Sequence, residues 1–458
     1  MPHIEDIASH TTREFKKYKS EYIEARLEQS RSNNITYRGR KLESISKISS
    51  IGGNIRSYIK GGWGFASFNK VEDVTPHIEQ AIEQARLVSK KEGKLAYVAP
   101  VTDTLSSGTD IDPKNIPLAK KKQLLDEYNE IIWRTPKLQT SVIGYSDSYK
   151  KSLFINSSGS FIRQERSDYV LRLTAIATNG SEVQQANISV GSRDNFDQIL
   201  NLHSRVDEMA NRSVELLEAP QIKGGEYTVV LDPVLAGVFV HEAFGHLSES
   251  DFVYENENMR QIMKLGKKFG SKDLSVIDSA LIPDLRGSYK YDDEGVPASK
   301  TYLINEGVLV GRLHSRETAA KMGEKPTGNS RTINYRYPPI VRMTNTYIEP
   351  RKATFNEIIA DIREGIYAKN WYGGTTSMEM FTFSAGEAYM IRNGKIAELI
   401  RPVVLSGNVF TTLNNIEAIG NDLEMNQGGG CGKGGQMPLP VANGSPHIRI
   451  RSCLVGGV

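Results

Sequence analysis

Two histidines and a glutamate lie close together at residues 241–246, which read HEAFGH. Two imidazoles and a carboxylate are the smallest set of side chains that can hold a divalent metal ion and activate a water molecule beside it. The whole chain contains eight histidines, so two of them in one short segment point to a shared role. The alternative interpretation is a surface helix on which the two histidines are neighbours by chance.

The spacing of the two histidines sets a condition on the backbone. Residues five apart on a regular α-helix differ by about 140° around the axis, whereas residues four apart differ by about 40°. His241 and His246 can therefore reach one metal ion only where a π-type bulge widens the helix or where the helix is broken. Gly245 directly precedes His246 and lowers the cost of such a distortion. We therefore predict a helix irregularity near Gly245.

A hydrolytic zinc site normally takes three ligands from the protein and leaves one position for water, so a third ligand is needed. The chain has two cysteines, Cys431 and Cys453. Cys431 is the preferred candidate, because its glycine-rich surroundings let the backbone approach a metal closely and Lys433 would favour a thiolate. Glu249, shortly after His246, is the rival ligand. Cys453 lies among apolar residues and is expected to be a small buried hydrophobe.

The residues before the motif indicate that a buried helix carries it. Gly225–Leu231 is rich in β-branched and aromatic residues, which predicts a strand. Asp232 then offers an oxygen for helix capping, and Pro233 suits the first helical position, so the helix is expected to begin there. The apolar residues that follow have helical spacing. They predict a helix that packs against a core and ends at His241 and Glu242.

The chain as a whole predicts an α+β fold with two domains, because 458 residues are many for a single core. Residues 1–222 are expected to form an N-terminal mixed α/β domain. Its helices are predicted at 73–91, 120–133 and 195–218, and half-buried strands at 22–28 and 168–174.

Residues 223–458 are expected to form a strand-rich C-terminal domain that carries the motif helix. It has one other clear helix signal, which begins with the capping box of Thr354 and Glu357. The isoleucines predicted to face inward from this helix are Ile358, Ile359, Ile362 and Ile366.

The composition is that of a soluble globular protein, with 39% hydrophobic and 24% charged residues. A net charge of +3 is small for this length, so we expect no nucleic-acid partner and no membrane partner. Two cysteines fit a reducing compartment. The first residues lack a basic segment leading into an apolar one, and no run is long enough to cross a bilayer. A cytoplasmic location is therefore expected.

These motifs resemble the TldD/PmbA family of metallopeptidases, in particular its motif-bearing TldD type. The resemblance is carried by HEAFGH with Glu249 and Asp251 after it, and by the glycine-rich run at residues 431–436. Further similar runs extend over nearly the whole chain, at residues 61–67, 292–295, 325–329, 342–346, 372–374 and 419–422.

The resemblance implies a zinc ion held by His241, His246 and Cys431, with Glu242 as the general base of peptide hydrolysis. It implies oligopeptides or unfolded polypeptide segments as substrates, held in the enclosed cavity of a dimer. The partner in such a dimer is commonly a related subunit that lacks HExxxH, and a homodimer is the other possibility.

The way a peptide could bind is suggested by two glycine-rich segments, predicted as loops. Gly430 and Gly432 flank Cys431, and Gly373 and Gly374 form the second segment. Their backbone groups could bind an extended peptide as an added strand. Because a thiolate donates more charge to zinc than an imidazole does, we expect modest activity.

A second hypothesis is a zinc-stabilised peptide-binding or regulatory protein without cleavage activity. The feature that separates the two hypotheses is Glu242. Structural zinc sites are closed by a fourth protein ligand and need no base, so a carboxylate beside the metal favours the enzyme.

Overall fold

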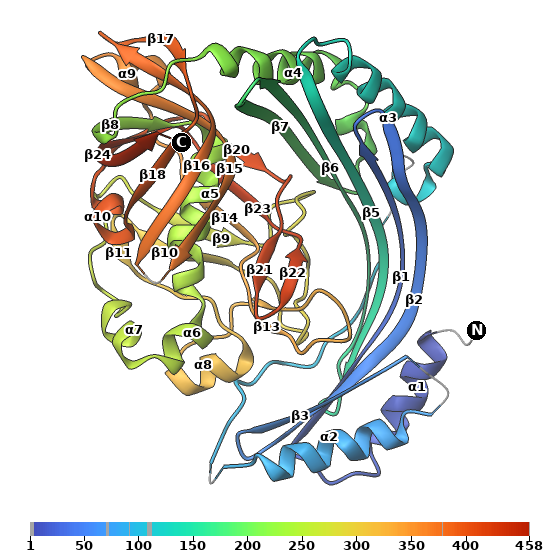
Figure 1. Cartoon of the computed structure of the whole chain (residues 1–458). Coiled ribbons are helices and arrows are strands. Elements are labelled where there is room, and N and C mark those ends of the chain that lie inside the picture. Colours follow the sequence, from blue (N-terminus) through green and yellow to red (C-terminus); the bar gives the residue numbers. More distant parts are fainter. Residues whose placement is uncertain (1–3, 70–72, 91, 108–111, 378, 458) are drawn as a thin grey trace.

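The computed structural model describes residues 4–69, 73–90, 92–107, 112–377 and 379–457. A long curved sheet from the N-terminal half forms one wall of the molecule, and the C-terminal half lies against its concave face (Figure 1). The α+β class predicted from the sequence is confirmed. Among the described residues, the helices are all too short or too polar to span a bilayer.

The N-terminal sheet has seven strands in the order β3-β2-β1-β5-β6-β4, with β7 also paired to β6. Its strands are β1 (Tyr22–Arg38), β2 (Lys41–Ile59), β3 (Gly62–Phe68), β4 (Thr102–Leu105), β5 (Leu138–Asn156), β6 (Phe161–Asn179) and β7 (Glu182–Arg193). Helices cover its outer face in two groups (Figure 1). These are α1 (Ile4–Phe15) and α2 (Thr75–Leu87) near β1–β3, and α3 (Leu118–Ile132) and α4 (His203–Glu218) near β5–β7.

The helices predicted at 73–91 and 120–133 are confirmed as α2 and α3, although Lys91 lies outside the described residues. The helix predicted at 195–218 is wrong in its first part. The Asn195 side chain accepts a hydrogen bond from the backbone N–H of Asp197, 3.0 Å away, and caps a short 3₁₀ turn at Phe196–Ile199. Such local side-chain bonding competes with an α-helix, and α4 begins only at His203.

The strand predicted at 168–174 is confirmed within β6 and is half-buried. The strand predicted at 22–28 exists, but it is buried on both faces. Its second face carries Glu24, Arg26 and Glu28, which are buried among charged partners from both halves of the chain. Arg26 pairs with Asp293 at 3.1 Å. The alternation of polar and apolar residues in this strand is therefore caused by a buried face of charged residues at an interface, and not by a solvent-exposed face.

The first sheet of the C-terminal half closes on itself. Its order is β15-β8-β24-β18-β16-β17, and β15 also pairs with β16, so five strands form a ring. The strands are β8 (Gly225–Leu231), β15 (Glu364–Ser377), β16 (Met380–Arg392), β17 (Lys395–Ile400), β18 (Val403–Asn408), β24 (Ile448–Gly457) and β19 (Ile416–Ile419), which pairs with β24.

A second, six-stranded sheet of this half has the order β11-β10-β9-β14-β23-β20. Its strands are β9 (Val276–Ser279), β10 (Lys300–Asn305), β11 (Val308–Leu309), β14 (Asn345–Ile348), β20 (Glu424–Asn426) and β23 (Ala442–Ser445). The remaining strands described in this half form two hairpins. These pair β12 (Ser330–Arg331) with β13 (Ile340–Val341) and β21 (Cys431–Lys433) with β22 (Gln436–Leu439).

Helix α5 (Pro233–Val240) lies between these two sheets and contacts β8 and β15 on one side and β14 and β23 on the other. The Asp232 side chain caps it by accepting the Leu235 N–H at 2.8 Å, and Pro233 occupies the first turn, as predicted. At Gly237, a Cβ would lie 3.0 Å from the backbone nitrogen of Gly444, so glycine lets the helix approach β23 closely. The helix is thus fixed from both sides before the motif begins.

The other helices of this half are short: α6 (Ser250–Glu255), α7 (Glu257–Ile262), α8 (Arg316–Met322), α9 (Phe355–Ile359) and α10 (Val409–Asn414). The helix predicted to begin at the capping box exists as α9, but it is shorter than the isoleucine spacing predicted. Its capping box at Thr354 and Glu357 is present, but α9 ends at Ile359. Ile366 instead lies in β15, where pairing with both β8 and β16 outweighs helical spacing. The predicted domain boundary between residues 222 and 223 falls between α4 and β8 and stays a prediction.

Candidate metal centre

The predicted helix irregularity is confirmed. The α-helix ends at Val240 and continues as a π-helical segment, His241–Gly245, followed by one 3₁₀ turn, His246–Ser248. The backbone N–H of His246 donates to the carbonyl of His241, which is the five-residue bond of a π-helix. As a result the two histidine rings come together, with 5.3 Å between their centroids.

The reason for glycine at position 245 differs from the one predicted. Its φ of −57° is that of an ordinary helix, so no special backbone freedom is used there. A Cβ at this position would lie 2.0 Å from the sulfur of Met343, which is fully buried. Gly245 is therefore needed for space, because the π-helical turn presses directly against Met343.

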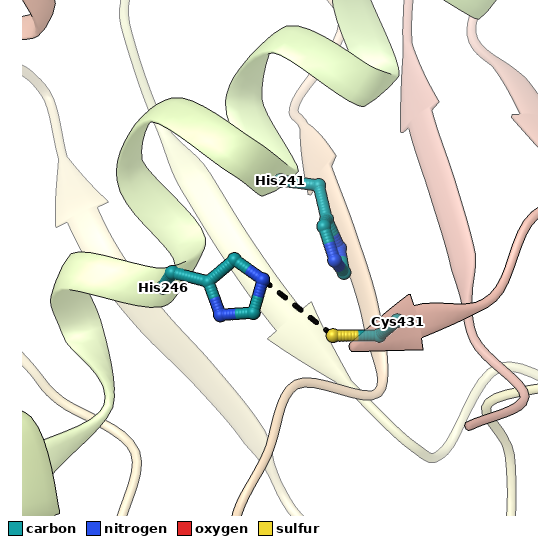
Figure 2. A group of neighbouring side chains, drawn as sticks. All are labelled: His241, His246 and Cys431. Carbon is teal, nitrogen blue, oxygen red and sulfur yellow. Dashed lines mark hydrogen bonds between the residues drawn. The ribbon is translucent and has the colours of Figure 1, made fainter. Parts of the chain in front are cut away.

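Cys431 completes the cluster from a distant part of the chain. It begins the hairpin strand β21, and its Sγ lies 3.6 Å from Nε2 of His246. One ligand atom from each of His241, His246 and Cys431 lies within 4.8 Å of the other two. Figure 2 shows both rings directed toward the sulfur. The structure thus brings together the three residues proposed as ligands.

The charges of the cluster favour a thiolate. Burial by itself would raise the pKa of the Cys431 thiol, but His241 and His246 beside it hold that pKa well below its usual range. Burial would likewise lower the pKa of His246, but Glu249 and Cys431 hold it well above the usual value. A thiolate is the form of cysteine that binds metals.

Glu249, the rival ligand, lies at the other nitrogen of the His246 ring. Its Oε2 is 3.0 Å from His246 Nδ1, and it is 1% exposed. Burial would raise the pKa of Glu249, but His246 and Lys433 lower it to about 2. An ionised carboxylate can only accept, so His246 Nδ1 donates the proton and Nε2 is left to face Cys431. Glu249 therefore orients the ring of His246, one of the three proposed ligands.

Lys433, which was expected to favour a thiolate at Cys431, makes polar contacts with other groups. Its ammonium donates to Asp251 at 2.7 Å and to the carbonyl of Val341 at 2.9 Å, and it pairs with Glu249 at 3.0 Å. The lysine thus balances the carboxylates of Glu249 and Asp251 next to the cluster.

Glu249→Gln is expected to weaken zinc binding by about 10–100-fold, because the amide is neutral and no longer fixes the His246 proton or balances Lys433. Asp251→Asn is the matched control, since Asp251 shares Lys433 but is not bonded to His246. Zinc affinity measured by chelator competition would show equal losses in both variants if Glu249 acted only through Lys433.

Glu242 lies beside the open side of the cluster. Its Oε2 is 3.8 Å from His246 Nε2, the ring atom that faces Cys431, and its side chain is 32% exposed. The carboxylate is therefore close to the position that a metal held by the three residues would take, and it is also reached by solvent. That placement suits a base that exchanges protons with water.

The donor set fits a zinc ion. Two imidazole nitrogens and a thiolate are ligands that zinc accepts and that magnesium or calcium does not prefer. The Nδ1 atom of His241 is buried and has no hydrogen-bond partner among the described residues. Buried polar atoms without a hydrogen-bond partner are rare, so the unpartnered nitrogen agrees with a bound metal ion as its missing partner.

The four glycines proposed to bind substrate lie in or beside strands, which corrects their prediction as loops. Gly373 and Gly374 belong to β15 and pair with β16. Gly432 lies in β21, and Gly430 directly precedes that strand. Cys453 is buried in β24, and burial raises the pKa of its thiol to about 12, as a structural hydrophobe requires.

Arg342 is a residue of the site to which the sequence assigned no role. It is fully buried and donates to the carbonyl of Cys431 at 2.9 Å and to that of Gln436 at 3.3 Å. It therefore holds the hairpin that carries the sulfur. Because its partners are backbone carbonyls far along the chain, no local spacing could have revealed this contact.

Three family models match the chain in succession. The model described as the PmbA/TldA metallopeptidase C-terminal domain matches residues 224–457. The models for PmbA/TldA metallopeptidase domain 1 and central domain match residues 23–89 and 111–219.

Whole proteins give the same result. A metalloprotease of Synechocystis is 49% identical over 440 residues, which cover 96% of this chain and 95% of that protein. A zinc metalloprotease TldD homolog of Saccharolobus solfataricus is 31% identical over 413 residues, which cover 89% of this chain and 90% of that protein. Among solved structures, TldE of Thermococcus kodakarensis has a TM-score of 0.79 at 20% identity, over 98% of this chain and 100% of that one. At this identity the structural likeness shows the fold alone.

Proposed function

The chain belongs to the PmbA/TldD family of metallopeptidases, and from this premise we propose that it is a zinc-dependent peptidase. Its proposed substrates are oligopeptides or unfolded polypeptide segments. The observation that carries the proposal is the π-helical turn that brings His241 and His246 to Cys431 with Glu242 alongside.

The proposed ligands are His241, His246 and Cys431. When bound there, zinc supplies Lewis acidity, which polarises a peptide carbonyl and makes a neighbouring water more acidic. Glu242 accepts a proton from that water at a carboxylate oxygen while the water oxygen adds to the carbonyl carbon. As the carbon–nitrogen bond breaks, Glu242 returns the proton to the leaving amine nitrogen. Glu249 keeps the His246 ring in the orientation that this reaction needs.

An extended peptide is proposed to bind along β15. Beyond Ala368, no strand of the described part of the chain pairs with the edge of β15 that faces away from β16. Trp371 and Tyr372, directly before Gly373 and Gly374, are 38% and 54% exposed. Backbone bonding to such an edge selects for extended conformation more than for side chains. Gly430 and Gly432 are proposed to line the peptide on the cysteine side.

The alternative of a peptide-binding protein without cleavage activity is less well supported. Within the described ranges the cluster offers three ligands, whereas a structural zinc site is closed by a fourth. Cleavage of denatured casein with and without a chelator separates the two functions. We expect cleavage that the chelator abolishes and added zinc restores. Zinc binding without chelator-sensitive cleavage, alone or with a partner subunit, would favour the binding protein.

We further propose that the protein works in the cytoplasm as a dimer, either with a related subunit that lacks HExxxH or as a homodimer. The similar fold of the TldE chain supports a related partner. Purification from the native source followed by mass analysis of co-purifying chains distinguishes the two assemblies.

A further inference from the structure

The loop that leads into Cys431 is held by a residue from another part of the chain. This cysteine loop comprises residues 427–430. Arg286, in the connection between β9 and β10, is 5% exposed. One nitrogen of its guanidinium donates to the carbonyls of Gln427 at 2.8 Å and Gly429 at 2.7 Å. Its backbone N–H also donates to the Gln427 side chain at 2.8 Å. Arg286 thus fixes the cysteine loop on both sides of Gly428.

The N-terminal sheet holds the carbonyl between these two contacts. Ser189 on β7 donates its hydroxyl to the carbonyl of Gly428 at 2.7 Å, and Arg172 on β6 reaches the same oxygen at 3.4 Å. The two backbones also touch. A Cβ at Gly428 would lie 2.5 Å from the carbonyl oxygen of Ser189, and one at Gly191 would lie 2.3 Å from that of Gln427. The cysteine loop is therefore docked directly on β7.

Arg286 is itself tied to the same sheet. Arg166 on β6 donates to the carbonyl of Arg286 at 2.7 Å, and the carboxylate of Asp168 lies 4.0 Å from the Arg286 guanidinium. Arg286 consequently stands between the N-terminal sheet and the cysteine loop, with bonds to both.

How rigidly this loop is held affects metal binding, because the loop is rich in glycine. Residues 428–430 are all glycine, which loses more conformational freedom on ordering than any other residue. Each residue left to move would have to be ordered when a metal binds, which costs conformational entropy. Donors that fix the carbonyls of the loop in advance remove part of that cost, and so they raise the affinity of the sulfur ligand for metal.

We infer that Arg286 is a positioning residue for Cys431, and that Arg286 and Ser189 couple zinc affinity to the docking of the N-terminal sheet. This role rests on the proposed zinc site and does not depend on peptide cleavage. Because binding couplings are reciprocal, zinc should also tighten the contact between β7 and the cysteine loop.

Zinc affinity measured by chelator competition tests this role. Arg286→Lys keeps the charge, but its side chain is one bond too short to place its nitrogen where the donating guanidinium nitrogen lies, and we expect it to weaken zinc binding by about 10–100-fold. Ser189→Ala removes one hydroxyl and should change affinity less, in the same direction. Arg193→Lys is the matched control, since Arg193 donates to the carbonyl of Ser288 at 2.8 Å, across the same interface but outside the cysteine loop. Its affinity should equal that of the wild type.

Two further measurements separate positioning from general stability. Cobalt-loaded Arg286→Lys should show a weaker thiolate-to-cobalt charge-transfer band, while the apoprotein melts as the Arg193→Lys control does. In the wild type, zinc should slow hydrogen exchange of the β7 amides, and Ser189→Ala should reduce that effect. Unchanged zinc affinity in both Arg286→Lys and Ser189→Ala, or an equal loss in Arg193→Lys, would overturn the role of Arg286. A wild-type protein that binds no zinc would overturn the metal site itself.

Discussion

Replacement of Glu242 by glutamine is expected to lower the rate of peptide hydrolysis by about 10²–10⁴ while zinc content and folding stay normal. The amide has nearly the same shape as the carboxylate but cannot accept the proton of the attacking water. Glu242 lies 3.8 Å from His246 Nε2 and outside the three-residue cluster, so its loss should not remove a ligand. Steady-state hydrolysis of denatured casein and metal analysis of the same sample measure both effects.

The control for this variant is Glu255→Gln. Glu255 is an exposed carboxylate at the end of α6, so the change removes the same charge away from the cluster. Its activity should match that of the wild type. Loss of zinc from Glu242→Gln would mean that Glu242 is a ligand and not the base.

Cys431→Ser is expected to abolish stoichiometric zinc binding and, with it, activity, because a hydroxyl is a poor zinc ligand at neutral pH. The chain supplies its own control in Cys453, which is equally buried but lies in β24. Cys453→Ser should keep its zinc and lose only some stability from packing. Zinc content after dialysis, together with urea unfolding, separates the two variants.

Comparison of Cys431→Ser with Glu249→Gln decides between the two candidate third ligands. We expect Cys431→Ser to lose zinc more completely than Glu249→Gln, which should retain it at reduced affinity. If Glu249→Gln is stripped of metal while Cys431→Ser keeps it, the assignment of the sulfur ligand is wrong.

The local features of the site could be predicted because they depend on residues close in sequence. The strand Gly225–Leu231, the cap at Asp232 and the π-helical turn all follow from side chains a few positions apart. The five-residue spacing of the histidines left few geometries that could bind one metal. The choice of Cys431 also followed from chemistry, since the chain offers two cysteines and one of them has apolar neighbours.

What holds the site in place could not be predicted, because it depends on contacts between distant segments. Arg286 and Arg342 bond to backbone carbonyls, which leave no trace in the pattern of side chains. Gly245 was expected to be needed for backbone freedom, but it makes room for Met343 across the core. The helices α6, α7, α8 and α10 are too short for apolar periodicity to reveal them.

X-ray absorption spectroscopy at the zinc edge of the purified protein identifies the metal ligands without reference to any activity assay. With His241, His246 and Cys431 as ligands, the spectrum should show one sulfur at about 2.3 Å and nitrogen or oxygen neighbours at about 2.0–2.1 Å. Cys431→Ser should lose the sulfur shell, and Cys453→Ser should keep it. A wild-type zinc site without sulfur, or with sulfur that survives in Cys431→Ser, would contradict the account.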